Sequence, residues 1–339
     1  MYPAPPAAPR VQFLTALSGD RDIEKSGSTL LRTLFGGPWP EFAPLRRPYG
    51  VAAHDGRLYV CDTQRRDIFV FDFRHDTFAH WPHPGVELEK PVAIRVRDSG
   101  GIDICDTGRR EVLCFTGDGE LTRTIGLQTL KSSGGSPSPT EFHPVGVADG
   151  PNGGLAILNA VESRVELVGS DGGYLGFWSS LGSQPGQLYR PRAMAQSGSG
   201  HLLISDPMNR RVLVLDTAGR AVAPIGEPGD QPGYIADPRG LTVDDQGVIY
   251  LTDVALQRVQ MFGMDGRYLM SFGHTDDGTH MPSPAGICVD RSCLAYFDEL
   301  VSPGFEAEYL IFVSNQVGPD KILVYAFGQG PAPITASSR

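Results

Sequence analysis

Polar residues, mostly basic, recur at equivalent places along the chain, each directly in front of a proline. The residues that precede the six recurring prolines are Arg47, Lys90, His143, Arg190, Asp237 and Ser283. Two more arginines, Arg192 and Arg239, directly follow two of these prolines. Guanidinium and ammonium groups bind carboxylates and phosphates through charge-assisted hydrogen bonds. If the fold brings these positions together, they form a cationic rim that attracts an anionic ligand or an acidic partner.

A second group of arginines lies in short turns that follow a repeated aspartate. The group comprises Arg65, Arg66, Arg109, Arg110, Arg210 and Arg211. Because an Asp–Arg pair recurs in nearly every repeat, we interpret it as architectural rather than catalytic, with the arginines serving the aspartates. The alternative adds these arginines, Arg66, Arg110 and Arg211 among them, to the cationic rim. Both interpretations stay open.

Arg95 interrupts a series of small residues four places after each proline. The equivalent positions hold Ala52, Ala148, Ala195, Thr242 and Cys288. Arg95 therefore either projects into a central channel as a site for an anion, or pairs with a hidden acid such as Asp149. The second alternative is favoured because buried charges are normally paired.

The signals for a metal or a nucleophile are poor. His75, His80 and His83 cluster on a segment expected to be an outer strand, a poor setting for a metal site. His143 is the one histidine expected at the channel mouth, and no G-x-S-x-G or P-loop motif is present. We expect no catalytic residue, no metal and no cofactor. A lyase or hydrolase with a metal near His143 and Asp237 remains the alternative.

Charge and hydropathy limit the class of partner. The formal net charge of −10 argues against wholesale binding to nucleic acid or to an anionic membrane. No apolar run is long enough to span a bilayer, and residues 1–10 lack the apolar core of a signal peptide. The proline-rich start fits either an exported chain whose signal has been removed or a cytoplasmic protein.

Repetition predicts the fold. The prolines Pro48, Pro91, Pro144, Pro191, Pro238 and Pro284 are separated by 43, 53, 47, 47 and 46 residues. A period in the forties, with strand-length apolar pieces and turns between them, is typical of the four-stranded blades of a propeller. The sequence thus predicts an all-β, six-bladed β-propeller over residues 11–330. Residues 1–10 form a flexible arm and residues 331–339 a flexible tail.

The sixth repeat is expected to depart from the others. An insertion at about residues 292–308 separates its first two strands, and the repeat ends without a fourth strand. We expect Val11–Gly19 to supply the missing strand, because such closure leaves no long open edge. A short helix is expected around residues 28–34.

The five cysteines divide into two groups. Cys61 and Cys105 precede repeat aspartates and are expected to be small buried side chains. Cys288 and Cys293 flank a short turn and could form a disulfide in an oxidising compartment.

The elements P-x-G-V-A, Y-V-x-D and R-V-x-V-F-D resemble NHL repeats, and six copies resemble the six-bladed NHL propeller. The resemblance covers roughly residues 45–330. More narrowly, PAPPAAPRVQFLTALSG and the last repeat resemble bacterial exported NHL proteins encoded near multihaem c-type cytochromes. Asp67 and Glu111 depart from the pattern, because they stand where Arg164, Arg211 and Arg258 head the third strand. The resemblance implies a binding or scaffolding role at the cell surface or in the periplasm.

Three functions follow, in order of preference. The first is a non-enzymatic propeller that binds a protein partner, for which the resemblance suggests an extracellular multihaem cytochrome or electron conduit. Its binding residues would be the rim and channel residues Arg47, Arg66, Lys90, Arg95, Arg110, His143, Arg190, Arg192, Arg211, Asp237 and Arg239. The second is the metal-dependent lyase or hydrolase. The third is RNA binding, disfavoured because the rim lacks the aromatic residues on which bases stack.

Overall fold

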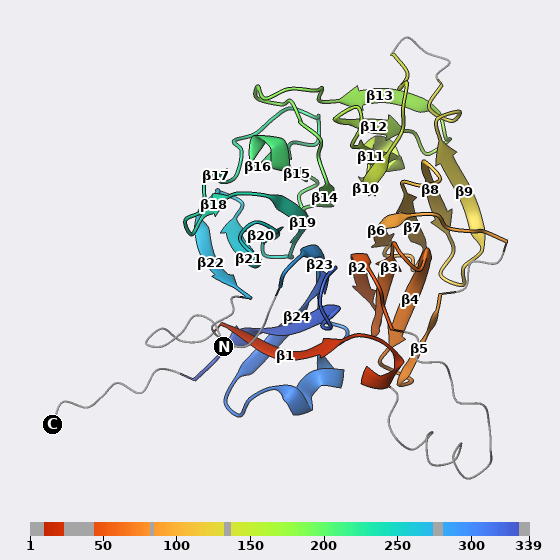
Figure 1. Cartoon of the computed structure of the whole chain (residues 1–339). Coiled ribbons are helices and arrows are strands. Elements are labelled where there is room, and N and C mark those ends of the chain that lie inside the picture. Colours follow the sequence, from red (N-terminus) through yellow and green to blue (C-terminus); the bar gives the residue numbers. More distant parts are fainter. Residues whose placement is uncertain (1–9, 24–43, 82–84, 132–136, 274–280, 332–339) are drawn as a thin grey trace.

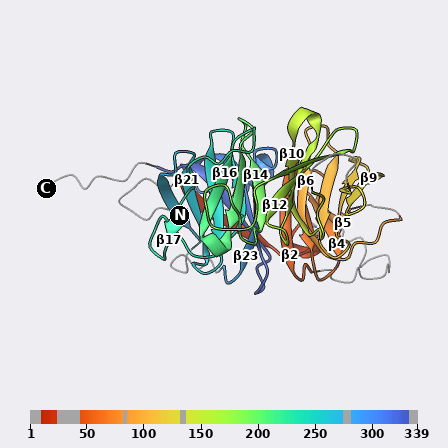
Figure 2. The same cartoon turned by 90° about the horizontal axis from the view of Figure 1, so that it is seen from above.

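The computed structural model describes residues 10–23, 44–81, 85–131, 137–273 and 281–331. Six β-sheets stand around a common axis like the blades of a propeller (Figure 1), and the disc is seen edge-on in Figure 2. The predicted fold, including the closure of the last blade by the N-terminal strand, is confirmed. No helix in these ranges is both long and apolar enough to cross a membrane.

Each blade begins with an inner strand that lies beside the axis. Blade 1 comprises β2 (Pro48–His54), β3 (Arg57–Asp62), β4 (Asp67–Asp72) and β5 (Thr77–His80). Blade 2 comprises β6 (Pro91–Val96), β7 (Ile102–Asp106), β8 (Glu111–Phe115) and β9 (Leu121–Gly126). Blade 3 comprises β10 (Pro144–Asp149), β11 (Leu155–Asn159), β12 (Arg164–Val168) and β13 (Tyr174–Trp178), with the short 3-10 helix η2 (Pro151–Gly153) after β10.

The second half of the ring repeats this plan with variations. Blade 4 comprises β14 (Ala193–Gln196), β15 (Leu202–Asp206) and β16 (Arg211–Leu215), with η3 (Pro207–Asn209) and the two-residue strands β17 (Glu227–Pro228) and β18 (Tyr234–Ile235) nearby in sequence. Blade 5 comprises β19 (Pro238–Val243), β20 (Val248–Asp253), β21 (Arg258–Gly263) and β22 (Tyr268–Phe272). Blade 6 comprises β23 (Pro284–Asp290), β24 (Glu306–Asn315), β25 (Ile322–Gln329) and β1 (Val11–Leu17), which η1 (Asp20–Asp22) follows.

The outer edge of blade 4 is less regular than expected. A four-stranded blade requires an outer strand after β16, but residues 219–226 meet β16 only through the bridges Leu215–Ala221 and Val212–Ile225. Pro224 lies between the two bridges and has no N–H to donate to a ladder. The proline therefore accounts for the interruption.

Hydrophobic cores fill the spaces between neighbouring blades. One core joins Tyr59 and Ile68 of blade 1 to Leu113 and Phe115 of blade 2. The middle strands β7 and β15 are buried along their whole length, as expected for strands covered on both faces. Side chains that point to either face of a blade thus contribute to one core or the next.

The Pro-x-Gly motif allows the inner strands to approach one another closely. A β-carbon on Gly50 would lie 2.8 Å from the carbonyl oxygen of Val92 in blade 2. On Gly240 it would lie 2.0 Å from the carbonyl oxygen of Ala285 in blade 6. Glycine is required at these positions because neighbouring main chains contact each other there.

The insertion of blade 6 folds as a short 3-10 helix, η5 (Leu294–Leu300). Phe297 of this helix packs edge-on against Phe73 of blade 1, with ring centroids 5.0 Å apart. The insertion ends earlier than predicted, because β24 begins at Glu306.

All five cysteines are free thiols, so the structure contains no Cys288–Cys293 disulfide. Cys61 and Cys105 are buried, as predicted. The helix expected at residues 28–34 lies outside the described residues, as do most of the proposed N-terminal arm and C-terminal tail.

Candidate functional site

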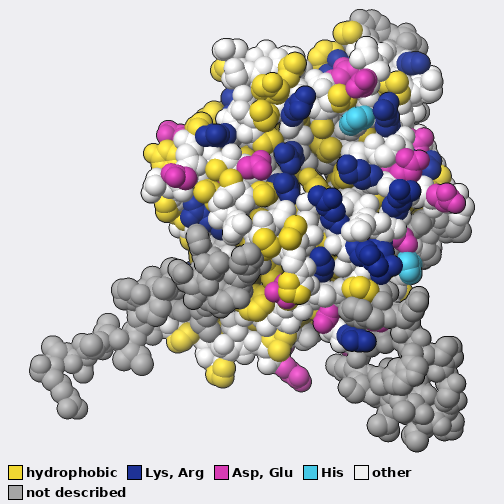
Figure 3. Space-filling view, in the orientation of Figure 1, with side chains coloured by type: hydrophobic (Ala, Val, Ile, Leu, Met, Phe, Trp, Pro, Cys, Tyr) yellow, Lys and Arg dark blue, Asp and Glu magenta, His cyan; other side chains and the backbone are white. Residues whose placement is uncertain are grey.

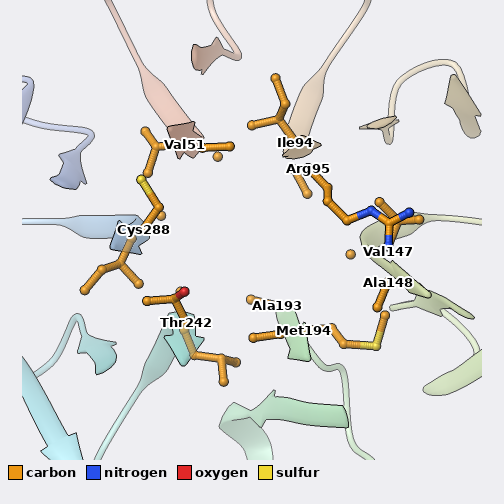
Figure 4. A pocket seen from close by; sticks show the side chains of 18 of the residues that line it. Val51, Ile94, Arg95, Val147, Ala148, Ala193, Met194, Thr242 and Cys288 are labelled. Carbon is orange, nitrogen blue, oxygen red and sulfur yellow. The ribbon is translucent and has the colours of Figure 1, made fainter. Parts of the chain in front are cut away.

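A channel of about 360 Å³ runs between the six inner strands. Its wall is mostly aliphatic or small, as the close view in Figure 4 shows for Val51, Ile94, Val147, Ala148 and Met194. We call the end where the inner strands begin the upper mouth, and the end where they finish the lower mouth. The upper face is the side of the disc that carries the upper mouth and the turns between the second and third strands of each blade. The lower face is the opposite side.

Repeat aspartates fix the loops of the upper face through main-chain amides. The Asp62 carboxylate accepts hydrogen bonds from the backbone N–H groups of Arg46, Arg47, Gln64 and Arg65, at 2.6–3.1 Å. This one carboxylate therefore holds both the segment that leads into β2 and the turn after β3. It has no side-chain hydrogen bond with an arginine among the described residues.

Equivalent residues of the other blades bind the main chain in a similar way. We call such a residue, with the backbone N–H groups that it binds, a clamp. Asp106 accepts the N–H groups of Glu89, Lys90, Gly108 and Arg109, at 2.8–3.0 Å. Asp206 and Asp253 bind the segments before their own blades in the same way, and Asn159 and Asn315 each accept one such N–H. The structural interpretation of the repeated acids is confirmed, but the main partners of Asp62, Asp106 and Asp253 are backbone N–H groups, and Asp206 alone of the four also binds the side chains of Asn209 and Arg211 among the described residues.

The arginines that head the third strands are bound in different ways. Arg211 pairs with Asp206 at 3.0 Å and also donates to the carbonyl of Gln187 at 2.7 Å. Arg164 pairs instead with Glu162 and Glu166, at 3.1 and 2.8 Å. Arg211 is therefore a structural residue, although the sequence placed it among the candidate binding residues.

Eight cations of the upper face make no side-chain hydrogen bond or ion pair with any part of the chain that the structure describes. They are Arg46, Arg47, Arg66, Lys90, Arg110, Arg190, Arg192 and Arg210. We call this set the upper rim. Figure 3 looks onto this face and shows Lys and Arg side chains gathered around the axis. The sequence predicted six members of the set as binding residues, and the structure places them on one face.

Arg239 differs from the rim residues because its guanidinium is largely enclosed. Its Nη1 donates to the Ser283 hydroxyl at 3.3 Å and to the Gln316 side-chain oxygen at 3.2 Å. Its Nε is buried and has no hydrogen-bond partner among the described residues. Burial lowers the pKa of Arg239, and the nearby charges of Arg192 and Arg47 lower it further.

Arg95 lies toward the lower mouth and is fully engaged by acids. It donates to Asp103 at 2.8 Å and to Asp149 at 2.9 Å, and Figure 4 shows its side chain reaching toward blade 3. Of the two alternatives for Arg95, the structure has the acid pair. Asp103 was missed, although it lies directly opposite Arg95 on the neighbouring strand.

Asp103 also affects a buried thiol. Burial raises the pKa of Cys114 to about 12, and the charge of Asp103 and its hydrogen bond to the thiol act in the same direction. Cys114 is thus a buried structural thiol rather than a reactive one.

His143 and Asp237 do not form part of a metal site in the structure as described. Their backbone N–H groups bind Asn159 and Asp253 respectively. Within the described ranges, no group of three or more His, Cys, Asp or Glu side chains is arranged to hold a metal ion.

The upper face also exposes apolar side chains that the sequence analysis missed. Leu181 and Met208 are 60% and 58% exposed, and Tyr189 is 41% exposed. These three lie close together, because the Asn209 side chain binds the carbonyl of Gly182 and Asp206 binds the N–H of Tyr189. Val317 is exposed in the equivalent turn of blade 6. Apolar residues at turn positions that are normally polar were the available signal.

Comparisons with known proteins support the fold alone. No protein-family model matches the chain, and no curated protein matches it in a sequence search. Among solved structures, it is similar to virginiamycin B lyase from Staphylococcus aureus (14% identity, TM-score 0.54, covering 82% of this chain and 83% of that one). A putative gluconolactonase has 14% identity and a TM-score of 0.55, with 96% and 94% covered. A protein of unknown function from Bacteroides thetaiotaomicron has 15% identity and a TM-score of 0.60, with 95% and 76% covered.

Proposed function

We propose that the protein is a binding propeller whose upper face docks an acidic protein surface. The observation that carries this proposal is the upper rim, in which eight cations have no acidic partner among the described residues. Charges placed in this way attract an oppositely charged partner and orient it during encounter.

The exposed apolar residues support a protein partner rather than a small ion. Tyr, Met and Arg are enriched in the cores of protein interfaces, and Tyr and Arg are frequent hot spots. Leu181, Tyr189 and Met208 form such a patch beside Arg190 and Arg210. The patch is held in place by the hydrogen bonds of Asn209 and Arg211 to the neighbouring loop. A partner therefore meets a preorganised surface.

The class of partner follows from the same chemistry. It presents carboxylates to the rim and an apolar contact to the Leu181–Tyr189–Met208 patch. The resemblance to exported NHL proteins makes a multihaem c-type cytochrome with an acidic surface the first partner to test, in a periplasmic or cell-surface setting.

The test compares two variants of equal charge. Arg47→Gln/Arg190→Gln removes two rim cations, whereas Arg220→Gln/Arg267→Gln removes two exposed arginines that already face Asp216 and Asp265. Immobilised wild type is used to capture a partner from the host, and the complex is rebuilt from purified proteins at about 50 and about 300 mM NaCl. We expect the rim variant to bind about tenfold more weakly and the control to bind like wild type. Equal affinities for both variants, or failure to rebuild any complex, would refute the proposal.

A further inference from the structure

The surroundings of Arg239 contain more positive than negative charge. Arg192 and Arg239 stand at the start of neighbouring inner strands, and Ser205 joins their main chains: the Arg192 N–H donates to the Ser205 carbonyl at 3.1 Å, and the Ser205 hydroxyl donates to the Arg239 carbonyl at 2.7 Å. The charges of Arg192 and Arg47 lower the pKa of Arg239, and the charge of Asp237 raises it. Asp237 makes no ion pair within the described part of the chain. Three guanidiniums and the Asp237 carboxylate thus lie near one another at the upper mouth.

A buried cation is normally paired, because removing it from water is unfavourable without a counter-charge. Arg239 is half-buried; among the described residues its guanidinium donates to two neutral oxygens, at 3.2 and 3.3 Å, and its buried Nε has no hydrogen-bond partner there. Arg192 lines the channel and has no partner at all among the described residues. This arrangement is suited to an anion that enters from outside the chain.

The channel below these arginines is suited to an apolar group. Val51, Ile94, Val147, Met194 and Leu241 line its middle. Its volume of about 360 Å³ lies within the range of small-molecule sites, which combine an apolar wall with a few placed polar groups.

The lower mouth differs from the upper mouth in charge. Arg95 is the long cation at that end, and Asp103 and Asp149 already neutralise it. An anionic group therefore gains more from the upper mouth than from the lower one. A ligand with one anionic end enters with its apolar end first.

We propose that the channel binds a small organic monocarboxylate, with the carboxylate between Arg192 and Arg239 and the apolar chain extending toward Met194 and Leu241. Arg192 belongs both to this site and to the upper rim, whereas Arg239 and the channel wall lie outside the upper rim. A free inorganic anion uses the same arginines but leaves the apolar wall in water. A carboxylate on a partner protein reaches the arginines without filling the channel.

The experiment measures binding of straight-chain carboxylates, from acetate to decanoate, to the full chain by calorimetry. Inorganic phosphate and the matching alcohols are the comparison ligands. We expect affinity to rise about fourfold for each added methylene until the channel is full, because each buried methylene adds a similar hydrophobic gain. A flat series, or phosphate binding as tightly as the longest acid, would overturn the proposal.

Variants of the protein test separately how the carboxylate and the apolar chain of the ligand contribute to binding. Arg192→Gln should weaken carboxylate binding at least tenfold and leave the alcohols unchanged, whereas Arg190→Gln, on the exposed rim, should change neither. Thr242→Phe narrows the channel and should abolish the chain-length dependence while acetate still binds. Retained chain-length dependence in folded Thr242→Phe contradicts the proposal. These measurements contain no protein partner, so their failure leaves the rim proposal standing, and loss of the partner leaves the channel proposal standing.

Discussion

The two faces of the propeller differ in how many of their cations have an acidic partner, although Arg109, Arg164 and Arg211 of the upper face do pair with acids. On the lower face, arginines lie against carboxylates, as in the pairs of Arg57 and Arg74 with Asp72, Arg95 with Asp103, and Arg291 with Asp245. On the upper face, the eight rim cations have no such partner within the described residues. The net charge of −10 conceals this difference.

The difference arises from what the acids of each face do. The upper aspartates are buried and give their oxygens mainly to backbone amides, because every blade must fix the segment that leads into its inner strand. The lower acids accept backbone amides as well, but side chains reach them too: Asp72 accepts the N–H of Arg74 and also binds two guanidinium groups. A repeated structural acid can thus leave neighbouring cations free for a ligand.

The largest effect is expected from breaking an upper clamp. Asp62→Ala removes the acceptor of four backbone N–H groups. Buried donors left without partners are costly, so we expect a loss of about 3–5 kcal/mol in the free energy of unfolding, measured by urea denaturation.

Asp62→Asn is the control, since blades 3 and 6 use Asn159 and Asn315 at this position. It keeps an acceptor oxygen and should lose about 1–2 kcal/mol. A loss below about 1 kcal/mol for Asp62→Ala would mean that the upper loops keep their conformation without the Asp62 carboxylate. The position of the upper-rim cations would then not depend on its hydrogen bonds.

The fold could be predicted because its signals repeat. Pro48, Gly50 and Asp62 each perform a task that every blade needs, so comparing the copies separates architecture from individual features. Blade 4 shows the limit, because Pro224 interrupts its outer edge and no second copy of that edge carries a proline. The pairing of β1 with β25 could be predicted since the sixth repeat lacks a strand and the chain start has the pattern of one.

The site was harder to predict because partners depend on contacts between repeats. The sequence placed Arg95, Arg192 and Arg211 in one candidate set, yet each has a different environment. Arg95 pairs with two acids, Arg211 with one acid and a carbonyl, and Arg192 with none among the described residues. The position of an arginine within the sequence repeat predicts the face of the propeller on which it lies, but not the oxygen atom to which its side chain donates.

The next largest effect tests the lower mouth. Arg95→Met keeps the apolar stem of the side chain but leaves Asp103, which is fully buried, with Arg97 at 3.7 Å as its one remaining cation among the described residues. Breaking a buried pair in this way should lower the free energy of unfolding by about 3 kcal/mol, measured in urea. Adding Asp103→Leu should restore at least half of the loss. If the single variant is as stable as wild type, the lower mouth does not need the pair and the contrast between the mouths fails.

A smaller effect is expected for the pH dependence of the stability that Asp72 contributes on the lower face. Burial alone raises the pKa of Asp72, but hydrogen bonds from Arg74, Arg57 and His75 outweigh it and hold the pKa well below its usual range. The unfolded pKa is about 3.9, so this stabilisation is complete above about pH 5 and is lost as pH falls toward the folded value.

Asp72→Asn should therefore lower the free energy of unfolding by about 1–2 kcal/mol at pH 7 and by progressively less as the pH falls below about 4. Urea denaturation at several pH values measures this. A deficit that stays constant down to about pH 2 would show that Asp72 acts through its shape rather than its charge.

The smallest expected effect on stability comes from removing Arg239 at the upper mouth. Arg239→Met removes two long hydrogen bonds, to Ser283 and Gln316, but also removes a half-buried cation whose pKa the charges of Arg192 and Arg47 lower. These changes oppose each other, so the free energy of unfolding should stay within about 1 kcal/mol of wild type.

The salt dependence of stability distinguishes the loss of the hydrogen bonds from the relief of charge repulsion. Wild type should gain stability between low and moderate salt, because screening weakens the repulsion among the guanidiniums, and Arg239→Met should gain less. Urea denaturation at two salt concentrations measures the difference. If Arg239→Met loses as much stability as Arg95→Met, then Arg239 is a structural residue like its counterpart at the lower mouth. If it loses little, Arg239 is a half-buried cation that folding does not require, as expected for a residue retained to bind an anion.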